Sequence, residues 1–136
     1  METVTVRRDL LLTLVSCELP LTVPAVLEYS SGDPYAVRMV FYPGADEVRW
    51  VFSRDILDEG LIREAGDGDV QVVPVVNETG EQLVLIRLAA PGGIAVLEAC
   101  PDAVAEFVTR IFAVVPSGAE NDHLAVDEAI AVLLAA

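Results

Sequence analysis

The sequence predicts an α+β protein in which a strand-rich region comes first and helices end the chain. Through most of the first two-thirds of the 136 residues, apolar and polar side chains alternate with a period of two, which is typical of strands that bury one face. Gly, Pro and Asp residues divide this region into short segments and predict tight turns. After Pro101, apolar residues follow the 3.6-residue spacing of an amphipathic helix. The length suits a single domain, residues 1–136.

Four strands joined by short turns are expected first, and they predict an antiparallel meander. Their alternating segments are residues 4–14, 19–27, 35–41 and 48–52. Pro20 and Pro24 predict that the second strand lies at a sheet edge or contains a bulge, because proline has no N–H to donate to a neighbouring strand.

A short helix is expected next, with Ser53 as its N-cap and Gly60 as its stop. Three more strands should follow, at residues 70–76, 83–88 and 94–97. Pro74 again indicates an edge or a bulge. The middle segment is apolar on both faces, which predicts a strand covered on both sides.

Two helices are expected at the end of the chain. The first begins at Pro101, ends at Pro116 to Gly118, and has a regular apolar stripe. The stripe consists of Val104, Phe107, Val108, Ile111, Phe112 and Val115. Asp122 could cap the second helix, whose apolar residues are Val126, Ile130, Leu133 and Leu134.

The charge and hydropathy limit the function classes. The net charge is −14, and all eight basic residues are arginine. Such a surface repels phosphate backbones and anionic lipids, so neither nucleic acid nor a membrane surface is an expected partner. Hydrophobic residues make up 54% of the chain, and the mean hydropathy is +0.52. This excess predicts that some apolar surface faces a second subunit or a partner protein. No segment approaches the ~20 apolar residues of a membrane span, so no direct membrane insertion is expected.

Candidate catalytic and ligand-binding residues are few. His123, the only histidine, is expected to be a solvated or capping residue. Cys17 and Cys100 lack metal-type spacing and lie in apolar stretches, so we expect buried, inert thiols in a reducing cytoplasm. The segment 66–69, Gly-Asp-Gly-Asp, is expected to be a turn, not a calcium loop. The sequence therefore predicts no catalytic, cofactor or metal site and favours a protein that holds other proteins.

Several fragments, in order, resemble one known family. They are Asp-Pro-Tyr-Ala-Val at 33–37, Trp-Val-Phe-Ser-Arg-Asp-Ile-Leu at 50–57, Glu-Gly-Leu at 59–61 and Gly-Asp-Val at 68–70. Their order and spacing resemble the SsgA-like proteins, SsgB-like members included, which are small acidic actinomycete proteins of sporulation and cell division. The matched positions are Asp33, Pro34, Tyr35, Trp50, Phe52, Arg54, Asp55, Leu57, Gly60, Gly68 and Asp69.

The resemblance implies a non-enzymatic regulator, without cofactors, that acts as an adaptor in the cytoplasm at division septa. It would help to select septum sites and recruit FtsZ, with FtsZ and/or other SsgA-like proteins as partners and a homo-oligomer, expected to be a trimer, as its state. The implied fold is whirly-like: two antiparallel β-sheets packed across each other, with a short middle helix and two C-terminal helices. The alternative is a whirly-like regulator that binds single-stranded nucleic acid, which the acidic balance disfavours; an enzyme is a third possibility.

The matched positions carry structural expectations of their own. The pair at 33–34 predicts a turn, and Tyr35 and Trp50, which lie on the apolar side of their strands, are expected in the core. Arg54 and Asp55 are polar, stand at a helix start and have no evident core role. These two residues are therefore the candidates for contact with a partner.

Overall fold

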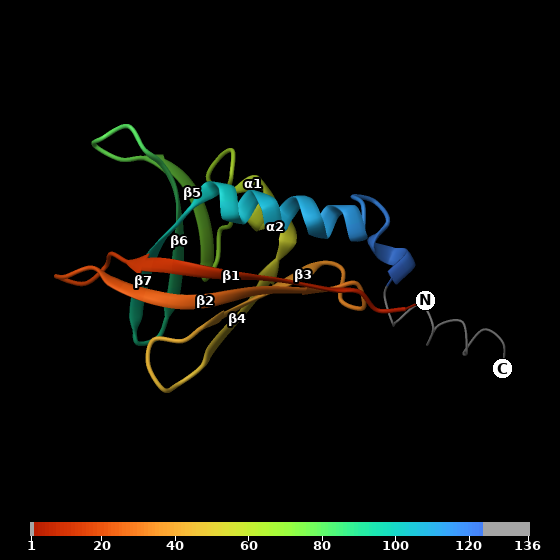
Figure 1. Ribbon diagram of the computed structural model, residues 1–136, viewed down its shortest axis with the longest axis horizontal. Coiled ribbons are helices and arrows are strands. Elements are labelled where there is room, and N and C mark those ends of the chain that lie inside the picture. The colour runs from red at the N-terminus through yellow and green to blue at the C-terminus, as the bar shows by residue number, and fades with distance from the viewer. Residues whose placement is uncertain (1, 124–136) are drawn as a thin grey trace.

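Seven strands form one continuous sheet in the computed structural model, which describes residues 2–123 (Figure 1). Their order across the sheet is β4-β3-β2-β1-β7-β6-β5. The strands are β1 (Thr5–Leu14), β2 (Leu21–Ser30), β3 (Ala36–Phe41), β4 (Val48–Ser53), β5 (Val70–Val76), β6 (Gln82–Ala90) and β7 (Gly93–Ala99). The helices are α1 (Arg54–Glu59), α2 (Pro101–Val114) and the 3₁₀ helix η1 (Glu120–His123).

Two antiparallel meanders, β1–β4 and β5–β7, make up this sheet, as the alternating pattern predicts. They are joined by a short ladder in which Thr13 and Leu14 of β1 pair with β7, and the Val15 N–H extends it by donating to the Val96 carbonyl at 2.9 Å. Strands β5 and β6 run across the direction of β1 and β2 (Figure 1). The expected pair of separate sheets is therefore wrong, because the end of β1 bonds to both meanders; alternation within a strand does not reveal this junction.

The position of β2 also corrects a prediction. This strand lies between β1 and β3 with one-to-one pairing along β1, so it is neither an edge strand nor bulged. Pro24 is tolerated because its nitrogen faces β3 at the position where the pairing of β2 with β3 ends. There the Pro24 carbonyl accepts from the N–H of Tyr42 at 2.9 Å, and Tyr42 is the first residue after β3. By contrast, β5 is an edge strand, as Pro74 predicts.

The core lies between the inner face of the sheet and α2, which runs along β1 (Figure 1). Helix α2 begins at Pro101 and buries the predicted stripe, with Phe112 partly buried against the core. Strand β6 alternates between buried and half-buried residues, so the prediction that both its faces are covered is wrong. The expected last helix lies almost entirely outside the described residues, which end in η1. No helix within residues 2–123 is long and apolar enough to cross a membrane.

Candidate functional site

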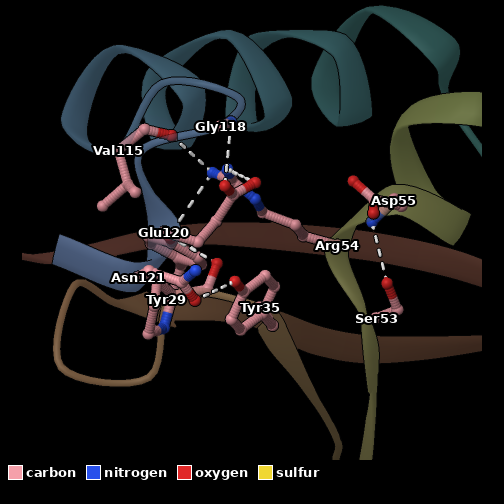
Figure 2. A network of polar contacts seen from close by, with 10 residues as sticks. Tyr29, Tyr35, Ser53, Arg54, Asp55, Val115, Gly118, Glu120 and Asn121 are labelled. Carbon is pink, nitrogen blue, oxygen red and sulfur yellow. Dashed lines mark hydrogen bonds and ion pairs between the residues drawn. The ribbon is translucent and has the colours of Figure 1, made fainter. Parts of the chain in front are cut away.

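Arg54 is the largest fully buried side chain among the described residues, with an exposed fraction of 1%. It occupies the first position of α1, where the Ser53 hydroxyl caps the helix by accepting from the Asp55 N–H at 3.1 Å. The Arg54 N–H donates to the Tyr35 carbonyl at 2.8 Å, which continues the pairing of β3 with β4 into the helix. The strand end and the cap together fix the Arg54 backbone, and the side chain is directed into the interior below α2 (Figure 2).

The guanidinium of Arg54 bonds to the segment that follows α2 (Figure 2). Its Nη2 lies 2.8 Å from the Glu120 Oε1 in an ion pair, and its Nη1 donates to the Val115 carbonyl at 2.7 Å. The other carboxylate oxygen of Glu120 accepts from the Gly118 N–H at 2.8 Å. The buried positive charge therefore has a charged partner that is itself held by the backbone, as a buried ion needs.

Two aromatic rings complete the surroundings of this arginine. The guanidinium carbon lies 3.9 Å from the ring centroid of Phe112 and 5.8 Å from that of Tyr29, which is cation–π geometry. The Tyr29 hydroxyl accepts from the Arg54 Nη1 at 3.4 Å and donates to the Pro34 carbonyl at 2.8 Å. We call Tyr29, Arg54, Phe112, Val115 and Glu120 the Arg54 cluster.

The Arg54 cluster corrects the expectation for Arg54. A side chain buried to this extent has a core role, and in this structure it offers no surface to a partner. Asp55 is exposed, and its contact with a partner stays a prediction. Glu120 is the residue that sequence reasoning missed; a lone arginine and a lone acid far apart in the chain give no local pattern that pairs them.

Tyr35 is the second correction. It is 43% exposed and does not belong to the core, because it precedes β3 and its hydroxyl donates to the Asn121 Oδ1 at 2.6 Å. This bond and the Arg54 ion pair both tie the motif residues 34–54 to residues 115–121. They fix the point from which the chain continues beyond the described residues.

The polar contacts shift two pKa values in the Arg54 cluster. The hydrogen bond from Arg54, supported by backbone N–H groups, holds the pKa of the Glu120 carboxyl below its usual value. Burial raises the pKa of the Tyr29 hydroxyl, and the nearby Arg54 charge opposes this rise. At neutral pH, Glu120 is therefore ionised and Tyr29 is neutral, which is the state that this set of hydrogen bonds requires.

Acidification is expected to weaken the tie between Arg54 and Glu120. Because the pKa of Glu120 is lower in the folded protein, its contribution to stability is present at neutral pH and is lost as the pH falls below the ordinary value of about 4.3. In a carboxyl ¹³C NMR titration, Glu120 should therefore titrate below that value. The difference in urea midpoint between the wild type and Glu120→Gln should shrink over the same range; a difference independent of pH would contradict this.

Five other motif positions are not part of this cluster. Phe52 and Leu57 are buried, as apolar residues of β4 and α1 should be, and Trp50 is half-buried. Gly68 and Asp69 lie in an exposed turn, where the Asp69 carbonyl accepts from the Ala89 N–H at 2.8 Å. No group of three or more His, Cys, Asp or Glu residues in the described part of the chain is arranged to hold a metal ion.

The cysteine prediction is wrong. Cys17 and Cys100 are both exposed free thiols. Cys17 lies in the connection between β1 and β2, and Cys100 stands between β7 and α2. Both positions are outside the strands and helices that bury apolar side chains, and even the neighbouring Leu19 is exposed. The side chain of His123 lies outside the described part of the structure.

A groove of about 390 Å³ opens between the β3–β4 hairpin and the β6–β7 hairpin. Its lining is almost wholly apolar and includes Leu14, Phe41, Val48, Trp50, Ile94 and Leu97. Val48 and Ile94 are exposed, whereas Trp50 is partly covered and packs against the core. A half-buried tryptophan in an apolar hollow is typical of a surface that binds another protein. The groove and the Arg54 cluster share no residue.

Comparisons with known proteins give consistent relatives. The family model described as "Streptomyces sporulation and cell division protein, SsgA" matches residues 23–120. The sporulation-specific cell division protein SsgB of Kineococcus radiotolerans is 50% identical over 115 residues, which are 84% of this chain and 70% of that protein. SsgB of Streptomyces coelicolor is 47% identical over 123 residues, 90% of this chain and 89% of that protein. The crystal structure of an SsgA-like sporulation-specific cell division protein from Thermobifida fusca has a TM-score of 0.86 at 36% identity and covers 96% of both chains.

Proposed function

Because the chain belongs to the SsgA family of sporulation and cell division proteins, we propose that it is a non-enzymatic adaptor that helps to select septum sites and recruits FtsZ to them. The observation that carries this proposal is the identity of about half of the residues to proteins named SsgB along most of the chain. Recruitment of FtsZ goes beyond those names, and its support is the apolar groove beside Trp50.

The apolar groove beside Trp50 supports an adaptor role. Its lining is mostly apolar, so it offers few polar groups for the chemistry of a small substrate and can accept apolar side chains of a partner. Tryptophan in the centre of such a surface often contributes much of the binding free energy. We assign the contact with FtsZ to this groove.

Self-association is part of the same proposal. Large apolar side chains are exposed at several places on the surface, including Leu11, Leu19 and Leu21 in and around the β1–β2 hairpin. Contiguous apolar surface is typical of subunit interfaces. We propose a homo-oligomer, with a trimer as its state, that works at division septa; sedimentation equilibrium measures the state directly.

Replacing Ile94 by glutamate should weaken FtsZ binding about tenfold, because a charge placed in an apolar contact must be desolvated without a partner. Ile94 is 53% exposed, so the fold should tolerate the change. The measurement is the affinity of purified FtsZ from the same organism for the immobilised full chain, in the wild type and in Ile94→Glu.

Ile62→Glu is the matched control. Ile62 is 71% exposed and lies after α1, outside the groove lining. It carries the same side chain and receives the same charge, so its effect on affinity should be small. Equal weakening by both variants would point to charge alone, and absence of FtsZ binding by the wild-type chain would contradict the proposed function.

A further inference from the structure

The outer edge of β4 exposes unpaired backbone groups. The Arg54 N–H donates to the Tyr35 carbonyl, and β4 pairs with β3 residue for residue, so alternate β4 residues bond to β3. The residues between them, Arg49 and Val51, direct their N–H and C=O groups away from β3. Neither residue makes a backbone hydrogen bond on that side with any other described part of the chain.

The opposite edge of the sheet is protected in two ways. On β5, the outward-facing backbone groups of Val72 bond to Ala65, with N–H to carbonyl distances of 2.9 and 3.0 Å. Two residues later, Pro74 has no N–H to offer. Proline and covering segments are the devices by which proteins block edge-to-edge pairing. Strand β4 contains neither a proline nor a bulge along its six pairs with β3.

We propose that the open edge of β4 receives an extended segment of a partner protein as an additional strand. The unpaired backbone donors and acceptors of Arg49 and Val51 require the bound segment to be extended, because only an extended chain can form hydrogen bonds with both residues. The inner face of such a strand continues the face of β4 that carries Val48 and Trp50, which line the apolar groove. Alternate side chains of the segment must therefore be apolar.

Charge defines the ends of this segment. Acidic residues bracket β4, with Asp46 before it and Asp55 after it, and both are exposed. Neither makes an ion pair within residues 2–123, and the whole chain carries a charge of −14. A partner segment with basic residues at both ends of an alternating apolar core complements this edge.

Amide hydrogen exchange by NMR tests the open edge directly. In the free full-length protein, the Arg49 and Val51 amides should exchange fast, while those of Trp50 and Phe52, which bond to β3, should exchange slowly. Binding of the partner should protect Arg49 and Val51. If both amides are already protected in the free protein, a second copy of the chain covers the edge and the proposal is overturned.

Val51→Pro tests the same edge by mutation. Proline removes an outward N–H and places its ring on the edge, without breaking a hydrogen bond to β3. Binding should fall at least about tenfold. Val51→Thr keeps the N–H and should bind normally. Val76→Pro is the matched control, because the Val76 backbone faces outward on the protected β5 edge, and it should also leave binding unchanged.

The probes are purified FtsZ and a pair of short synthetic peptides of alternating valine and threonine, one with lysine and the other with glutamate at its ends. The proposal rests on the proposed function only for the identity of the partner. If FtsZ binds and Val51→Pro leaves its affinity unchanged, the edge proposal is overturned while the proposed function stands. If FtsZ does not bind at all, the proposed function fails, and the experiments with the peptides then test whether the β4 edge binds an extended segment. Protection of Arg49 and Val51 by the lysine peptide alone supports it, and no protection overturns it.

Discussion

Replacing Arg54 by alanine is expected to lower the free energy of unfolding by about 3–5 kcal/mol, which is the usual cost of removing one partner of a buried ion pair. The change removes the donors to Glu120 and to the Val115 carbonyl and leaves a cavity below the ring of Phe112. The Glu120 carboxylate would then keep only backbone N–H groups as partners, that of Gly118 among them. Urea denaturation followed by tryptophan fluorescence measures the loss.

Two further variants separate the ion pair from the general cost of losing an arginine. Arg63 is exposed and makes no ion pair with the described residues, so Arg63→Ala should change stability by less than about 0.5 kcal/mol. Arg54→Lys should fall between the wild type and Arg54→Ala, because an ammonium keeps the charge but cannot bond in two directions and stack on Phe112 at once. If Arg54→Ala proved as stable as Arg63→Ala, the contacts of the Arg54 cluster would not contribute to the free energy of unfolding, and the prediction would be wrong.

Local pattern predicted the elements, whereas contacts between distant segments escaped it. Ser53 as a cap and Pro101 as a helix start are signals within a few residues, and both are confirmed. The pairing of Arg54 with Glu120 joins positions 66 residues apart, and no period or motif marks it. The exposure of Tyr35 was not predicted for a related reason. The alternating pattern includes Tyr35, but β3 begins one residue later, at Ala36. The apolar groove was also not predicted, because its two hairpins come from different meanders.

Gly60 illustrates the same limit at a position whose role the sequence only partly explains. It does follow the last residue of α1, as a helix stop should. Its φ of −63° and ψ of −12° are, however, ordinary right-handed helical values that any residue adopts. The need for glycine comes from β5: a Cβ at this position would overlap the Cβ and Cγ1 of Val72 and lie 2.9 Å from the Ile56 carbonyl oxygen.

Gly60→Ala is therefore expected to destabilise the protein by about 2–3 kcal/mol, the cost of forcing an extra carbon into a packed interior. The matched control is Gly68→Ala, since Gly68 is also a motif glycine but its Cβ would meet nothing within 4 Å. That variant should be neutral or slightly stabilising in the same urea denaturation.

A double-mutant cycle with Val72→Ala then identifies the cause. Val72 is fully buried, so its truncation alone should destabilise the fold. In the double variant, the overlap with Cγ1 disappears while the overlap with the Cβ of residue 72 remains. The relief is therefore partial, and the combined cost should be smaller than the sum of the two single costs by about 1 kcal/mol. Additive costs would mean that the glycine acts on the helix end by itself. A coupling of the expected sign would show that α1, and with it Arg54 at its other end, is held in place by close contact with β5.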